Sequence, residues 1–340
     1  MCARTHSVCS RPACSSVRLN SARCSVTGQR RMATITMNST QITFFSFSAY
    51  FDTGRLKYLY FLVVMFIYSF IMFSNLLLIV VICVNRTLHE PMYLFLVSLF
   101  VNELCGSSGL FPLILVQILS DSHTVSVPLC FLQIFSLHFY GSVELFTLGA
   151  MSYDRYVAIC CPLQYNVLMS LRKVWAMTAS VWLYSVLATL AMLSLSGPLQ
   201  LCGNIIHKVY CDNFSVVKLS CYDTTINNIY GLLYIFTVIA GLFLMILYSY
   251  VRILRVCLSG SHRTRQKALS TCTPHLSSMI NFCFGAFFEI VQGRVSSALQ
   301  IFLSLYTLTC QPLFNPSMYG LNLSKIRHVW QQTSELNVTY

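Results

Sequence analysis

Residues 58–83 read YLYFLVVMFIYSFIMFSNLLLIVVIC, and this stretch decides the fold class because it holds no Asp, Glu, Lys or Arg. A helix needs about 20 mostly apolar residues to cross a bilayer. Further candidate stretches lie at 92–116, 128–153, 174–195, 228–251, 269–290 and 298–320. The sequence therefore predicts an all-α integral membrane bundle of seven transmembrane helices. Because residues 269–278 are rich in Ser, Thr and Cys, six helices and one re-entrant segment are the alternative.

The composition excludes several classes of protein. Of the 340 residues, 56% are hydrophobic and 9% are charged, whereas a soluble domain carries about 25% charged residues. A soluble enzyme, a nucleic-acid-binding protein and a disordered chain are thereby excluded. The net charge of +12 does not mark a nucleic-acid site, because residues 1–36 alone hold six Arg and no acidic residue.

Basic residues orient the helices, since cytoplasmic loops carry an excess of Lys and Arg. The gaps after the first, third and fifth stretches, together with the tail, contain Arg86, Arg155, Arg172, Lys173, Arg252, Arg255, Arg263, Arg265, Lys267, Lys325 and Arg327. The opposite side contains Arg55, Lys57, Lys208, Lys218 and Arg294. We therefore expect an outer amino-terminal segment at 37–57, the seven-helix domain at 58–320 and a cytoplasmic tail at 321–340.

The first 36 residues do not fit this orientation, because they place six Arg on the outer side. They lack an apolar run of 7–15 residues and so are not a signal peptide. We interpret residues 1–36 as disordered or as an upstream gene-model extension, with a regulatory tail as the alternative. The sequon at Asn38 should be glycosylated, and those at Asn85, Asn322 and Asn337 should not, because they fall on the inner side. For Asn213 the sequence leaves the outcome open.

Four cysteines lie on the predicted outer side: Cys130, Cys202, Cys211 and Cys221. In an oxidising compartment four cysteines suggest two disulfides, with three possible connectivities. The spacing alone does not choose among them.

Two carboxylates fall inside apolar stretches. Counted at 1.5 Å per residue from the cytoplasmic side, Glu103 and Glu144 lie at similar depth near mid-membrane. A buried charge there is costly unless it is compensated. The two groups therefore share a proton, hold a cation between them, or are protonated acids hydrogen-bonded to other polar groups.

Other polar groups lie at membrane depth. Asn75 falls in the first stretch, and Asn315 with Pro316 falls in the seventh. Because proline lacks an N–H group, Pro316 should kink its helix and leave a backbone carbonyl unpaired. His138 has no second His or Cys three or four residues away, which argues against a metal ligand.

Five motifs occur in the order found in a known family. They are LHEPMY at 88–93, MSYDRYVAIC at 151–160, SY at 249–250, KALSTCTPHL at 267–276 and PLFNPSMYG at 312–320. They resemble the signatures of odorant receptors, which are rhodopsin-like G-protein-coupled receptors. The resemblance covers about residues 38–330, and the phrases at 101–104 and 163–166 resemble the fish branch.

The resemblance implies roles for individual residues. Asp154 and Arg155 would form an ionic lock at the cytoplasmic end of the third helix, and Tyr250 and Tyr319 would meet Arg155 on activation. The rest of this switch would be Tyr156, Asn315 and Pro316. The disulfides would be Cys130–Cys211 and Cys202–Cys221. Glu103 and Glu144 match positions where the family holds a sodium ion, although Asp is usual at the first of them.

The implied function is odorant sensing coupled to a stimulatory G protein, at the plasma membrane of olfactory sensory neurons. The ligand would bind in the outer half of the bundle, beside Leu137, His138, Gly141, Ser142 and Leu145 of the third helix. A transporter or channel with an intramembrane carboxylate cation site is the alternative. We expect no enzymatic activity and no cofactor apart from the sodium ion. Retinal is excluded, because residues 297–320 contain no Lys for a Schiff base.

Overall fold

The computed structural model describes residues 42–50, 54–234, 236, 240–259, 262–291 and 297–322. Residues 1–36, the sequons at Asn38 and Asn337 and residues 323–340 lie outside the described residues. The interpretation of the leader and the glycosylation of Asn38 therefore stay predictions.

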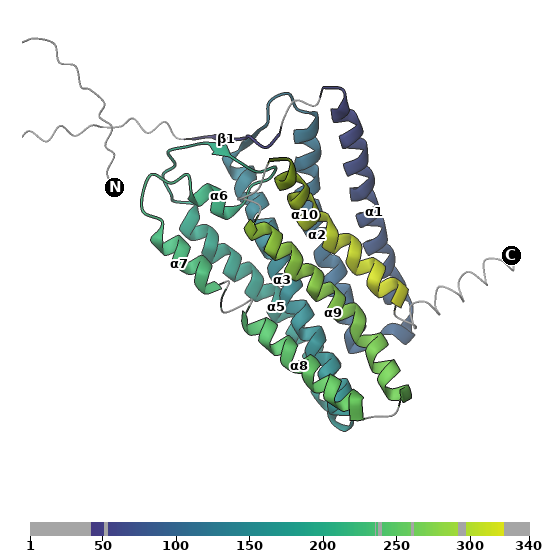
Figure 1. The fold of residues 1–340 in the computed structure, drawn as a ribbon. Helices are drawn as coiled ribbons and strands as arrows, with labels where there is room; N and C mark the ends of the chain where they lie inside the picture. The colour runs from purple at the N-terminus through teal and green to yellow at the C-terminus, as the bar shows by residue number, and fades with distance from the viewer. Residues whose placement is uncertain are drawn as a thin grey trace, which may run out of the picture. The chain divides into compact units, whose positions relative to one another are not determined.

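Long helices follow the predicted stretches closely (Figure 1), and the helices of the described residues form the expected bundle of seven transmembrane segments. The fifth segment contains two helices, and each of the others is a single helix. The helices are α1 (Leu56–Val84), α2 (Pro91–Leu119), α3 (Val127–Cys160), α5 (Leu171–Ser196), α7 (Thr225–Tyr234), α8 (Gly241–Ser259), α9 (His262–Val291) and α10 (Ser297–Asn322).

The distribution of side chains suits a lipid environment. Among the described residues, α1, α2, α3 and α5 are long and apolar enough to span a membrane, judged by length and composition. On α1, Phe66 exposes 72% of its surface while Asn75 is fully buried. Apolar side chains thus face outward and polar ones face the interior, the reverse of what a water-soluble helix needs.

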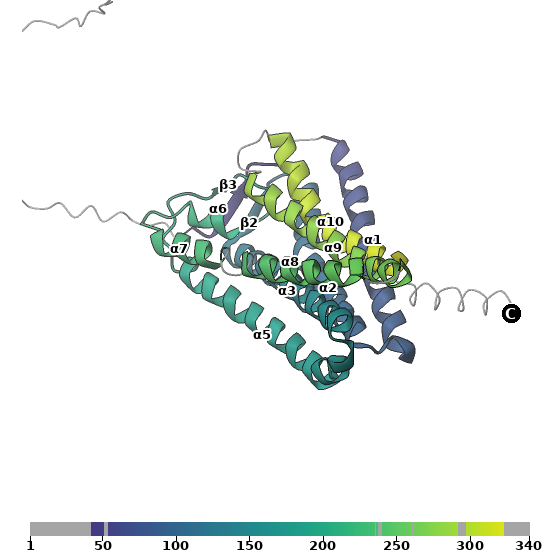
Figure 2. The ribbon, with the colours of Figure 1, turned by 60° about the horizontal axis from the view of Figure 1, so that its bottom comes forward.

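The third segment is the centre of the bundle. α3 packs against α2, α5, α8 and α9, and α1 and α10 complete the ring beside α2 (Figure 2). In the half nearer Asp154, the buried side chains of Leu99, Phe100 and Met151 form one apolar cluster with Tyr319 of α10. Side chains of α2, α3 and α10 therefore pack into one common core.

Short connections join the helices on the cytoplasmic side. A 3₁₀ turn, Arg86–Leu88, links α1 to α2, and a second, Pro162–Gln164, leads from α3 into the four-residue α4 (Tyr165–Leu168). Pro91 begins α2 at a position where its missing N–H group costs nothing.

Three short strands form a small sheet at the outer end, which the sequence did not predict. β1 (Phe44–Phe47) pairs antiparallel with β2 (Thr124–Ser126) and parallel with β3 (Ile205–Ile206). The sheet joins the amino-terminal segment to the first outer loop and to the long loop after α5. That loop also holds α6 (Asn213–Val217).

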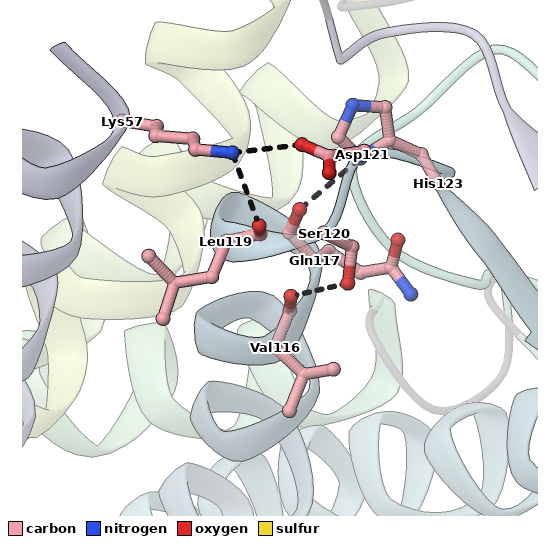
Figure 3. Close-up of polar contacts among 7 residues, drawn as sticks. All are labelled: Lys57, Val116, Gln117, Leu119, Ser120, Asp121 and His123. Atoms are coloured by element: carbon pink, nitrogen blue, oxygen red, sulfur yellow. Dashed lines mark hydrogen bonds and ion pairs between the residues drawn. The ribbon is translucent and has the colours of Figure 1, made fainter. Parts of the chain in front are cut away.

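Side chains satisfy the last carbonyl groups of α2 at the same end (Figure 3). Lys57 Nζ lies 2.8 Å from Asp121 Oδ1 and 3.5 Å from the Leu119 carbonyl oxygen. Ser120 Oγ donates to the Val116 carbonyl, and His123 Nδ1 donates to that of Gln117. Since helix ends leave such carbonyls without intrahelical partners, these contacts fix the end of α2 against the start of α1.

Candidate functional site

The two intramembrane carboxylates meet in the centre of the bundle. Glu103 on α2 and Glu144 on α3 are both fully buried. Asn315 on α10 joins them, because its Nδ2 donates to Glu103 Oε1 at 2.5 Å and to Glu144 Oε1 at 2.8 Å. One amide therefore links α2, α3 and α10.

A close approach of α2 and α3 supports this cluster. Tyr140 on α3 donates from its hydroxyl to Glu103 Oε2 at 2.9 Å. Its ring lies against Gly106, where an added Cβ would come within 2.5 Å of Tyr140 Cδ2. Only a glycine leaves this ring room to reach Glu103, so the spacing of Glu103 and Gly106 on one helix has a steric purpose.

Asn102 adds an acceptor beside the carboxylates. Its Nδ2 donates to the Tyr140 carbonyl at 3.0 Å and to Glu144 Oε2 at 3.5 Å. Its Oδ1 is buried and has no hydrogen-bond partner among the described residues. Ser107 Oγ, one helical turn from Glu103, is buried and unpartnered in the same sense. Carboxylate, amide and hydroxyl oxygens are the ligands that hard cations prefer, so this set of residues fits a sodium ion.

The polar network continues along α10 toward α1 and α9. As predicted, Pro316 leaves a carbonyl unpaired within the helix, that of Pro312, and Asn75 Nδ2 donates to it at 3.0 Å. Ser278 of α9 donates to Asn315 Oδ1 at 2.6 Å. Asn315 is thus bonded to three other helices, which couples any movement of α10 to the carboxylates.

At the cytoplasmic end of α3, Arg155 is held by its neighbour Asp154. Arg155 Nε donates to Asp154 Oδ2 at 2.9 Å, and its Nη2 forms an ion pair with the same oxygen. The second carboxylate oxygen accepts a hydrogen bond of 2.9 Å from the Tyr165 hydroxyl of α4. Asp154 is fully buried, so its carboxylate interacts with Arg155 and Tyr165 and not with solvent.

The two tyrosines expected to meet Arg155 make other contacts. The hydroxyl of Tyr319 shares a hydrogen bond of 3.3 Å with His275 Nδ1 of α9. The hydroxyl of Tyr250 is buried and has no hydrogen-bond partner among the described residues. The Tyr250 ring packs with Tyr156 of α3 against Ile253 and Cys272. The structure therefore has Arg155 on the carboxylate and neither tyrosine bonded to it.

A known protein family matches the part of the chain that contains these residues. The profile of the family described as "Olfactory receptor" matches residues 64–334, a range that includes the carboxylate cluster and the Asp154–Arg155 pair. The chain belongs to the olfactory receptor family. Membership makes the receptor an odorant-sensing G-protein-coupled receptor, and neither an enzyme nor the transporter or channel that was the alternative.

Individual relatives agree with this assignment over most of the receptor. Human olfactory receptor 4E2 is 32% identical over 305 residues, which cover 89% of this chain and 97% of the relative. Human olfactory receptor 1M1 is 35% identical over 267 residues, which cover 75% of this chain and 82% of the relative. The crystal structure of squid rhodopsin superposes with a TM-score of 0.65 at 17% identity, covering 85% of this chain and 89% of that one. That likeness shows the rhodopsin-like fold.

Both disulfides implied by the resemblance are present in the receptor. Cys130 at the top of α3 is bonded to Cys211, and Cys202 is bonded to Cys221 within the loop after α5. The Cys130–Cys211 bond lies in the same apolar cluster as Phe45, Val125 and Ile206 of the small sheet. The outer loop is therefore fixed to α3 and to the amino-terminal strand.

The expected ligand-binding residues of α3 face different neighbours. Leu137 packs into the cluster that contains Ile71 and Leu110, whereas the buried Ser142 donates to Ser185 Oγ of α5 at 2.9 Å. At 3.6 residues per turn, five positions along a helix differ by about 140°, which is why these two point apart.

Around the axis of α3, the remaining three expected residues lie between the directions of Leu137 and Ser142. His138 Nδ1 donates to the carbonyl of Ile134 on its own helix, at 3.0 Å. Leu145 is buried. At Gly141 an added Cβ would meet no atom within 4 Å, so space lies directly beside α3 at this level.

Three contact residues of the receptor were missed from sequence. Tyr165, Tyr140 and Asn102 each bond to one of the acidic side chains described above. A signal was available for Asn102 and Tyr140, because Asn102 is adjacent to Glu103 and Tyr140 lies about one helical turn before Glu144, which places both at the depth of the predicted buried carboxylates. No local signal marks Tyr165, since its partner lies across a loop.

Proposed function

We propose that the receptor binds a small organic odorant in the outer half of the bundle, between α3, the fifth segment, α9 and α10. Binding shifts the fifth to seventh segments and activates a heterotrimeric G protein of the stimulatory, olfactory type at the cytoplasmic end. The space beside Gly141 and the polar groups of His138 and Ser142 support this location. The receptor acts at the plasma membrane of olfactory sensory neurons.

The observation that carries this proposal is the unpartnered hydroxyl of Tyr250. A buried hydroxyl without a partner costs about 1–3 kcal/mol, yet Tyr250 lies beside α3, the helix that carries Arg155. In the proposed active state Arg155 separates from Asp154 and donates hydrogen bonds to the hydroxyl groups of Tyr250 and Tyr319. An arginine with two alternative sets of partners is a two-state element that a ligand can bias.

Asn315 supports a route from the ligand to this switch. It is bonded to Glu103, Glu144 and Ser278 at mid-membrane, and Tyr319 follows it by about one turn of α10. Movement of α9 or α10 caused by a ligand must therefore change the bonds of Asn315 and displace Tyr319. Pro312 and Pro316 make α10 easier to bend at this level.

We further propose that Glu103 and Glu144, with oxygens of Asn102 and Ser107, hold one sodium ion in the inactive receptor. The donors from Asn315, Tyr140 and Asn102 favour ionised carboxylates, and the pair then needs a positive charge to offset its burial. When bound, sodium supplies that charge. A proton shared by the two carboxyl groups is the competing chemistry, and it leaves Asn102 Oδ1 unpartnered.

The direct test of function is a screen of volatile and water-soluble organic compounds for cAMP production in cells that express the receptor. Arg155→Ala, matched for surface level, is the control for each active compound. We expect at least one compound to raise cAMP through the receptor and not through the variant. Responses that persist in Arg155→Ala would contradict the proposed switch, and coupling to a different second messenger would contradict the stimulatory G protein.

A further inference from the structure

A cavity of about 590 Å³ lies in the cytoplasmic half of the bundle, between α3, α5 and α8. Its volume falls within the range of about 300–1,000 Å³ that is usual for small-ligand sites. Phe146, Val181, Leu242 and Met245 form apolar walls, and Lys173 lies at the cytoplasmic end. This cavity is separate from the carboxylate cluster and from the outer half of the bundle.

The packing of the three helices explains why the cavity exists. α3 packs closely against both α5 and α8, whereas α5 and α8 make few contacts with each other (Figures 1 and 2). On the α8 side of the resulting fissure, Leu242 and Met245 pack onto Gly149 of α3, where an added Cβ would lie 3.0 Å from Leu242 Cδ2 and 3.2 Å from Met245 Cε. On the α5 side, the lining residues Ala176 and Ser180 are small, and none of the described side chains closes the fissure there.

The fissure opens toward the surrounding lipid. Trp175 on α5 is 57% exposed and Leu244 on α8 is 63% exposed, so large apolar side chains flank it on the exterior. From Lys173 to Val181 the helix rises by about 12 Å. The cavity therefore extends from the level of the lipid headgroups, where α5 begins, into the hydrocarbon region.

Lys173 gives the cavity a charged end. Its ammonium group donates to the Val167 carbonyl at 3.0 Å, which uses one of three N–H donors. Within the described ranges no carboxylate forms an ion pair with it, since the ion pairs there join Lys57 to Asp121, Arg155 to Asp154 and Lys208 to Asp212. A cation with donors to spare thus stands beside an apolar fissure at headgroup depth.

We propose that the cavity binds an anionic phospholipid of the cytoplasmic leaflet. The phosphate group accepts hydrogen bonds from Lys173, and one acyl chain lies against Phe146, Leu242 and Met245. The cytoplasmic leaflet is rich in anionic lipids, and a basic side chain at its surface attracts them. This site is independent of the odorant and of the switch at Arg155, so it does not rest on the proposed function.

The test uses the full-length receptor in phosphatidylcholine nanodiscs that contain a trace of photoreactive lipid. Phosphatidylserine and phosphatidylcholine probes carry the same photoreactive acyl chain, and labelled peptides are mapped by mass spectrometry. Lys173→Gln removes the charge, and Ala176→Phe fills the fissure. Arg172→Gln is the charge control at the same depth, and Leu183→Phe is the size control on an exposed position of α5.

We expect the phosphatidylserine probe to label the walls from α3, α5 and α8 more than the phosphatidylcholine probe does. Lys173→Gln should lower phosphatidylserine labelling about fivefold, the effect of one juxtamembrane cation, and lower phosphatidylcholine labelling by less, because the choline cation offsets the charge of its phosphate. Ala176→Phe should reduce labelling by both probes, while the two controls label like the wild type.

Three outcomes would overturn the proposal. The first is equal labelling of the wild type by both probes, and the second is an effect of Arg172→Gln as large as that of Lys173→Gln. The third is displacement of the label by cholesterol and not by unlabelled phosphatidylserine, which would indicate a sterol site. If Ala176→Phe fails to fold, as judged by thermal unfolding, the comparison of Lys173→Gln with Arg172→Gln still decides whether Lys173 binds the anionic headgroup.

Discussion

Tyr165, in the short helix after α3, donates a hydrogen bond of 2.9 Å to the buried carboxylate of Asp154. Since Asp154 is also the partner of Arg155, Tyr165 fixes the orientation in which the carboxylate holds the arginine. The inactive arrangement therefore depends on the loop that follows α3 as well as on α3 itself.

Removing this hydroxyl should loosen the hold on Arg155. We predict that Tyr165→Phe raises ligand-independent cAMP several-fold, because a hydrogen bond to a charged group contributes about 1.5–3 kcal/mol. Tyr60→Phe is the control, on an exposed tyrosine of α1. Both variants are compared with the wild type at equal surface level. Unchanged basal cAMP in Tyr165→Phe would show that the contact does not restrain the receptor.

The carboxylate pair predicts a dependence on sodium. Replacing choline chloride with sodium chloride should raise the Tm of the purified receptor, because a ligand bound only by the folded state stabilises it by about 1.4 kcal/mol at ten times its Kd. Glu144→Gln should remove the response, and Asp223→Asn, an acidic residue outside the bundle core, should retain it. Equal Tm values in the two salts, together with a Tm that depends on pH in the wild type but not in Glu144→Gln, would favour a shared proton.

The outer disulfides should contribute to stability separately from the free cysteines. Cys130→Ser should lower the free energy of unfolding by about 2–4 kcal/mol. Cys202→Ser should lower it by a similar or smaller amount, because the Cys202–Cys221 bond closes a shorter loop than the Cys130–Cys211 bond does. Cys105→Ser, at an exposed cysteine without a disulfide, is the control. Peptide mapping without reduction gives the pairing directly. Recovery of Cys130 as a free thiol would contradict it.

An ion pair in the outer loop predicts a specific response to acid. Burial raises the pKa of the Asp212 carboxyl, but Lys208 at 2.7 Å and hydrogen bonds from Ser215 outweigh burial and hold the pKa below its ordinary value. A carboxyl with a lowered folded pKa stabilises the fold above its unfolded pKa, about 3.9, and this contribution is lost as the pH falls through the folded pKa.

Thermal unfolding of the wild type below about pH 4 should therefore show this loss. In Lys208→Met the attraction is gone, and the hydrogen bonds from Ser215 alone oppose the effect of burial on the pKa of the Asp212 carboxyl. The variant should be less stable at neutral pH and lose less on acidification than the wild type does. Parallel pH curves for the two proteins would rule out the ion pair as the source of the acid response.

The spans of the bundle were predictable because hydropathy and length set them. The stretch at 58–83 became α1 at Leu56–Val84, and the carbonyl left unpaired by Pro316 followed from proline chemistry alone. The third helix extends to Cys160, seven residues past the predicted edge, because a helix need not end where the hydrocarbon does. The convergence of Glu103 and Glu144 was predictable from their equal depth.

Contacts between distant segments could not be predicted from the sequence. The sheet of Phe44–Phe47, Thr124–Ser126 and Ile205–Ile206 has strands too short to show an alternating pattern. The link from Tyr165 to Asp154 depends on how the loop turns back toward α3. The cavity beside Gly149 depends on the separation of α5 from α8, which no residue of either helix encodes alone.

The central claim is that Arg155 exchanges Asp154 for Tyr250, and ligand-independent cAMP at matched surface level tests it without an odorant. We predict that Asp154→Ala raises basal cAMP, because Arg155 is no longer held. The double variant Asp154→Ala/Tyr250→Phe should return to the wild-type level, because the released arginine lacks its second partner. Basal cAMP that is unchanged in Asp154→Ala, or that stays equally high in the double variant, would contradict the exchange.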